Sequence, residues 1–162
     1  MLGNNHYYHQ LTRKAVILFG RLFDDITLVR TNQDTGKEVG RTLVPIIYAP
    51  KDKMVTRLLS DPDLLKDTQI TLPRMSFELT SLQYDTSVKL NKMNKLSLPD
   101  IHGRSTVYNP VPYILNFQLT IYGKTQDDVL QIVEQILPYF NPEYVVTIKE
   151  VPELNINRDI PI

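Results

Sequence analysis

The chain has 162 residues, no cysteine, and as many basic as acidic side chains, 18 Lys plus Arg against 18 Asp plus Glu. A chain of this length is expected to form one domain with its own hydrophobic core. The lack of cysteine excludes disulfides, zinc–thiolate sites and thiol nucleophiles, and the zero net charge argues against a broad duplex-DNA-binding face, because such binding depends on neutralising phosphates.

The first predicted element is a helix over residues 7–23. Its apolar residues recur at helical spacing, as Leu11, Ala15, Leu18 and Leu22. Gly20 weakens this prediction, since glycine costs about 1 kcal/mol relative to alanine inside a helix.

Residues 26–30 and 41–48 are predicted to form a hairpin. The polar turn between them contains Gly36, which can take a positive φ. Pro45 lies within the second strand and has no N–H to donate, so this strand is expected at a sheet edge or with a bulge.

A short helix over residues 50–59 and a strand over residues 74–84 are predicted next. The apolar alternation of the strand slips at Thr80-Ser81. A slip of one residue is the pattern of a β-bulge.

Residues 85–112 have no clear period and are predicted to form a long loop. Loops of this length are usually functional or disordered. The loop has several basic residues, with no acid between Thr86 and Pro99. They form either a solvated, flexible arm or a contact surface for nucleic acid or an acidic protein partner, and they are Lys89, Lys92, Lys95 and Arg104.

Residues 113–122 alternate strictly between apolar and polar side chains, which predicts a strand with one buried face. A helix is predicted over residues 125–139, with Thr125 and Asp128 at capping-box spacing. A strand over residues 143–148 and an extended tail over residues 154–162 complete the chain. In this order the elements predict an α+β fold, with a mixed, mostly antiparallel β-sheet and helices packed on one face.

The second face of this sheet is predicted to be polar and almost uncharged. An ordinary solvated face and a contact between subunits both fit this pattern. Arg74, at the start of its strand, is expected either to bridge to a neighbour's carboxylate or to bind its own chain. The neutral polar residues of this face are Ser76, Thr80, Asn116, Gln118 and Thr120.

No constellation of residues points to catalysis, a metal or a cofactor. His6 and His9 are close in sequence, but His102 is far away and further ligands are missing. The phosphate-binding and nucleophile motifs of common enzymes are absent. We therefore expect no enzyme; the alternative, a small ligand-binding or enzymatic α+β domain, predicts a concave apolar pocket with converging polar groups.

No apolar run approaches the length of a membrane span, and the N-terminus lacks the apolar core of a signal peptide. We expect cytosolic synthesis and no membrane partner. Zero net charge also removes the self-repulsion that keeps monomers apart, which favours a subunit of an assembly.

Several strings, found together and in order, resemble the tail sheath stabilizer (tail completion, or tail terminator) family of T-even-type contractile-tailed bacteriophages. They are Val-Pro-Ile-Ile-Tyr-Ala-Pro-Lys at 44–51, Leu-Pro-Arg at 72–74, Tyr-Asn-Pro at 108–110, and Gln-Ile-Val-Glu-Gln-Ile-Leu-Pro-Tyr-Phe at 131–140. The late Arg-Asp-Ile at 158–160 fits the same family. The last of the four strings is the most specific.

The resemblance implies a structural virion protein made in the host cytoplasm. It implies a hexameric ring at the head-proximal end of the tail that ends the tail, secures the last sheath ring and offers a docking surface to the neck proteins. The implied partners are sister copies, the tail sheath, the tube terminator and the neck or connector proteins, with non-specific DNA contact in the lumen. A tube terminator or a head–tail connector ring is the nearest alternative.

The resemblance also implies a single tail-terminator-like domain over residues 1–162. Members of the family continue well past the Arg-Asp-Ile segment, whereas this chain stops at Ile162. For the ring contact we expect the exposed edge of the hairpin at residues 26–48 to meet a different surface of the next subunit.

Overall fold

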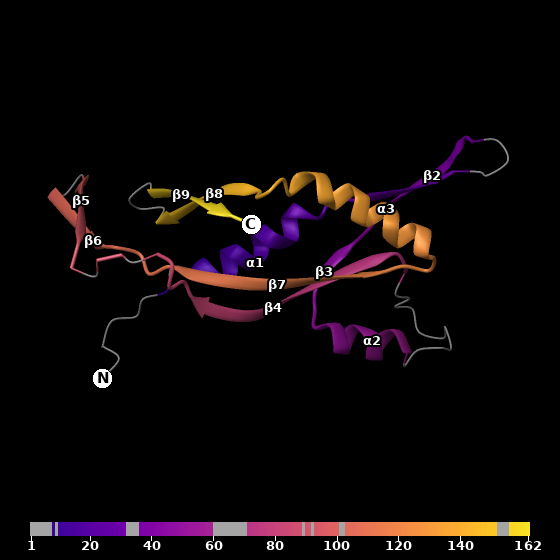
Figure 1. Ribbon diagram of the computed structural model, residues 1–162, viewed down its shortest axis with the longest axis horizontal. Helices are drawn as coiled ribbons and strands as arrows, with labels where there is room; N and C mark the ends of the chain where they lie inside the picture. Colours follow the sequence, from indigo (N-terminus) through magenta and orange to yellow (C-terminus); the bar gives the residue numbers. More distant parts are fainter. Residues whose placement is uncertain are drawn as a thin grey trace. The chain divides into compact units, whose positions relative to one another are not determined.

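The structure is a computed structural model that describes residues 8, 10–31, 36–59, 71–88, 90, 91, 93–100, 103–151 and 156–162. Figure 1 shows the helices and strands of the chain, coloured along the sequence. The chain divides into two compact units. One comprises Thr12–Glu78 and Phe117–Tyr144, and we call it the helical unit. The other comprises Met1–Leu11, Leu79–Asn116 and Val145–Ile162, and we call it the hairpin unit. Each unit is described by itself.

The helical unit contains most of the helices and a three-stranded sheet. Along the chain its elements are α1 (Leu11–Leu22), β1 (Thr27–Thr31), β2 (Glu38–Leu43), β3 (Ile46–Tyr48), α2 (Lys51–Leu59), the first part of β4 (Arg74–Tyr84), the later part of β7 (Tyr113–Tyr122), α3 (Gln126–Ile136) and a 3-10 turn, η1 (Leu137–Tyr139). β1 and β2 form an antiparallel hairpin. The sheet has the order β3–β4–β7, with β3 parallel to β4.

The hairpin unit contains two antiparallel hairpins and the remaining parts of β4 and β7. Its further strands are β5 (Lys95–Asp100), β6 (Gly103–Tyr108), β8 (Val145–Val151) and β9 (Ile156–Pro161), paired as β5–β6 and β8–β9. Helices combined with mostly antiparallel strands confirm the predicted α+β class.

The core of the helical unit lies between its sheet and helices α1 and α3. Its fully buried residues are Phe23, Leu28, Val44, Met75 and Ile132. Full burial of one such large apolar side chain stabilises a fold by about 1.5–3 kcal/mol. α1 also places Phe19 against Phe117 of β7, with ring centroids 4.5 Å apart.

Gly20 is a place where α1 packs closely against β4. A Cβ at this position would lie 3.2 Å from Cζ of Phe77, so the residue that weakens the helix propensity allows close packing on the sheet. The described helix begins after Gln10, whose φ of 56° lies outside the helical region.

The predicted strand at residues 41–48 is wrong as one strand, because it is divided at Pro45. The N–H of Val44 donates to the carbonyl of Ile26, 2.9 Å away, as the last rung of the hairpin with β1. The carbonyl of Pro45 then accepts from the N–H of Met75, 2.9 Å away, which begins the pairing with β4. Proline has no N–H, so the chain changes sheets there, and β3 is an edge strand as Pro45 predicted.

Two other segments differ from their predictions. Residues 85–112 are not one irregular loop, since they contain the β5–β6 hairpin. The tail at residues 154–162 is not simply extended, because β9 pairs with β8. By contrast, β4 has the predicted bounds. Oγ1 of Thr80 donates to the Asn116 carbonyl of β7, and Nδ2 of Asn116 donates to Oγ of Ser81, while the bulge expected at Thr80-Ser81 stays a prediction.

Candidate functional site

The feature of the helical unit most relevant to assembly is the contact of α3 with β1. The N–H of Val29 donates to Oε1 of Gln131, and Nε2 of Gln131 donates to the carbonyl of Val29, both at 3.1 Å. Nε2 of Gln135 donates to the carbonyl of Thr27 at 2.9 Å. Two glutamine side chains, one helical turn apart, thus occupy the positions that a neighbouring strand would take. The outer edge of β1 is closed at these residues.

The N-terminus of α3 contributes an ion pair to the same contact. Arg30 Nη2 lies 3.8 Å from Oδ2 of Asp128, which is 8% exposed. The Asp128 N–H donates to Oγ1 of Thr125 at 3.3 Å, so the predicted cap is confirmed. The carboxylate is therefore a structural group at the positive end of the helix.

β2, the second strand of the hairpin, is exposed along its whole length. Val39 is 70% and Leu43 56% exposed. Among the described residues no strand other than β1 pairs with β2. The hairpin therefore has one closed edge and one open edge.

The predicted polar face is divided between buried and exposed residues. Ser76 is buried and its hydroxyl lies 3.2 Å from that of Tyr122, while Thr120 is half-buried. Thr80 is exposed and donates to the Asn116 carbonyl at 2.9 Å, and Gln118 is exposed. Only part of this face is available to a partner.

Of the predicted basic residues, the structure describes Arg74, Lys95 and Arg104. Arg74 is half-buried in the helical unit, and its Nε is buried with no hydrogen-bond partner in the described part of the chain. Lys95 is exposed at the start of β5, and Arg104 lies in β6 opposite Pro99. Lys89 and Lys92 lie outside the described residues.

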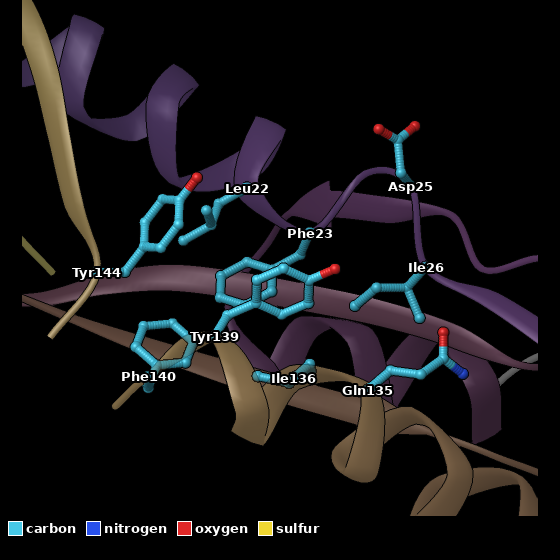
Figure 2. Close-up of a pocket in the computed structure, with 9 residues that line it drawn as sticks. All are labelled: Leu22, Phe23, Asp25, Ile26, Gln135, Ile136, Tyr139, Phe140 and Tyr144. Atoms are coloured by element: carbon cyan, nitrogen blue, oxygen red, sulfur yellow. The ribbon is translucent and has the colours of Figure 1, made fainter. Parts of the chain in front are cut away.

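The helical unit has one hollow of about 260 Å³ near the ends of α1 and α3 (Figure 2). Its lining is mainly aromatic and aliphatic, including Phe23, Tyr139 and Tyr144. Figure 2 shows the Asp25 carboxylate pointing away from the ring cluster. The other polar side chains of the lining are Tyr139, Tyr144 and Gln135, whose amide is already bonded to β1 and to the Gln131 carbonyl. The lining includes no histidine, and its one carboxylate points away, so these residues supply no pair of acid–base groups.

Asp85, in the hairpin unit, directly follows β4. The hydroxyl of Ser87 and then its N–H donate to the carboxylate, at 2.6 and 2.9 Å, and these bonds lower the pKa of Asp85. A lowered pKa keeps the group ionised and suits a turn rather than a proton-transfer role.

Within the described ranges, no cluster of three or more His, Asp or Glu side chains has the arrangement of a metal site. His6, His9 and His102 lie outside these ranges. None of the described helices has the length and apolar character needed to cross a membrane.

Sequence reasoning missed Gln131 and Gln135 as contact residues. They are four positions apart in a helix, which places them on one face. Nothing local shows that this face meets a strand more than a hundred residues earlier, at separations of 102 and 108 residues.

Residues 6–162 match the protein family described as "T4-like virus Myoviridae tail sheath stabiliser". The chain is also similar to the tail completion protein gp15 of Enterobacteria phage T4, with 33% identity over 165 residues. That alignment covers 96% of this chain and 57% of the T4 protein, so the chain spans little more than half the length of this relative.

Proposed function

Since this chain belongs to the tail sheath stabiliser family of T4-like Myoviridae, we propose that it forms a hexameric ring at the head-proximal end of a contractile phage tail. It is a structural component of the phage tail in the virion and not an enzyme. The number of subunits in the ring, the position of the ring in the tail and the proteins next to it are all proposed. We also propose that residues 1–162 form a single tail-terminator-like domain.

The observation that carries the ring proposal is the asymmetry of the β1–β2 hairpin. A ring closed by rotation joins two different patches of each subunit, unlike a two-fold dimer. The hairpin presents an open strand, β2, on one side and is fixed to α3 on the other. This asymmetry supports β2 as one patch of such a contact.

The ring would end the tail, hold the last sheath ring and offer its other face to the neck or connector proteins. Family membership favours this role over that of a tube terminator or a head–tail connector ring. We propose that the remaining contacts use polar and basic residues of the sheet face and of residues 85–112, with DNA in the lumen as a further partner. These residues are Arg74, Lys89, Lys92, Lys95, Arg104, Asn116, Gln118 and Thr120.

Electron microscopy of tails assembled without this protein tests the role. We expect tails whose sheath slips or contracts prematurely and which fail to join heads, with both defects reversed by supplying the protein. Normal, head-joined particles made in its absence would contradict the proposal.

A further inference from the structure

The backbone directions of the hairpin follow from its hydrogen bonds. In an antiparallel ladder, hydrogen-bonded pairs alternate with pairs whose backbone groups point to the two outer edges. Both backbone groups of Val29 bind Gln131 and therefore point away from β2. Arg41 is the ladder partner of Val29, so its N–H and C=O point outward on the opposite edge.

Leu43 follows the same rule. It is the ladder partner of Thr27, whose carbonyl points outward to Gln135. The rung from Val44 to Ile26 lies one residue further on, which agrees with the alternation. The open edge of β2 therefore presents the N–H and C=O groups of Arg41 and Leu43.

This open edge has less protection than the edge of β1. Natural sheets protect free edges with prolines, charged side chains, bulges or a covering segment, and β2 carries the charged side chains of Glu38 and Arg41. β1 has such a cover in Gln131 and Gln135. The register shift of the ladder lies between Arg30 and Thr31, towards the turn, so the stretch beside Arg41 and Leu43 is regular. Arg41 lies 3.9 Å from Glu38, which offsets its charge.

We propose that a strand of a second copy of this chain adds to β2 at Arg41 and Leu43, with Gln131 and Gln135 restricting the addition to that edge. This rests on the proposed ring. Each copy carries a second, different edge that fits such a contact: β7 is an outer strand of its sheet and has ten residues without charge or proline. Because the chain has zero net charge, its copies do not repel one another through their net charge.

Proline substitutions test the proposal without removing an internal rung. Arg41→Pro and Leu43→Pro each delete an outward N–H, and proline is tolerated where that group faces outward on an edge strand. Arg41→Thr and Leu43→Thr are the matched controls, since they change the side chain and keep the N–H. We expect the proline variants to lose rings, by about tenfold or more in subunit affinity, and the threonine variants to keep them.

Folded proline variants that form rings like the wild type would overturn the proposal. Proline variants that form normal rings but fail to hold the sheath would overturn it too, because the sheath protein would then be the partner that pairs with β2. Where a proline variant does not fold, hydrogen exchange on the wild type decides. The Arg41 and Leu43 amides should exchange about tenfold more slowly in the ring than in free subunits, and equal rates would refute the inference. A wild type that never forms rings would instead contradict the proposed function itself.

Discussion

The side-chain amide of Gln131 acts as a short substitute for a β-strand, because it both accepts from and donates to Val29. Few side chains can do this, since the amide alone combines a carbonyl and an NH₂ group in one plane. Gln131 therefore links α3 to β1 through two hydrogen bonds to the backbone of Val29.

Gln131→Leu should destabilise the protein by about 1–3 kcal/mol, because it leaves the N–H and C=O of Val29 without these partners. Chemical denaturation measures the change, and Gln126→Leu, at an exposed position of α3, is the control. Equal effects of the two substitutions would show that the amide contact adds nothing to stability.

Gly123→Ala should also destabilise, by about 1–3 kcal/mol, through overpacking. A Cβ at this position would lie 2.6 Å from Cγ2 of Val129, and the branched side chain of valine has little freedom to move away. Gly40→Ala is the matched control, since a Cβ there meets nothing within 4 Å. Thermal unfolding should separate the two variants, and a Gly123→Ala protein as stable as the control would contradict this packing.

At the scale of elements, α3 is the helix best defined by its own sequence. Thr125 caps it, and its first turn is acidic. Capping and the favourable dipole interaction are local effects, so they can be predicted from adjacent residues. The apolar alternations that predicted β4, with its slip at Thr80-Ser81, and β7 are equally local.

Thr125→Ala should lower stability by about 1 kcal/mol, since the N–H of Asp128 loses its acceptor. Thr125→Ser keeps a hydroxyl and should retain most of the stability of the wild type. The helical signal in circular dichroism during thermal unfolding measures both, and an alanine variant no less stable than the serine variant would exclude the cap as a stabilising contact.

The elements that sequence reasoning missed depend on distant partners. β3 is three residues long and pairs with β4 beyond an intervening helix, so no local period shows it. β5 contains Pro99, which argues against a strand, and β9 becomes a strand only by pairing with β8. The same reason explains why the open edge of β2 could be expected from the hairpin, whereas the closure of β1 could not.

The contact predicted for Lys89, Lys92 and Lys95 concerns partners outside the chain. Changing Lys89, Lys92 and Lys95 together to Ser should weaken particle assembly or DNA retention. It should also make assembly and DNA retention less sensitive to salt concentration, because phosphate and carboxylate contacts are screened by ions. Particle yield and genome retention at two salt concentrations measure this. Particles unchanged in both respects would indicate a solvated segment without a partner.

At the scale of the whole molecule, the protein is a tail component with zero net charge, and the described hairpin leaves the outer edge of β2 open. Its lack of net charge removes long-range repulsion between copies, and the open edge provides a direction for association. A monomer would leave that edge unused, whereas a closed ring would use it once in every subunit.

The mass of the purified protein in solution, measured by native mass spectrometry over a range of concentrations, tests the ring most directly. The account predicts a discrete species of six copies that grows at the expense of the monomer as concentration rises. A protein that stays monomeric at the highest concentrations, or that forms only an open-ended series of oligomers, would contradict it.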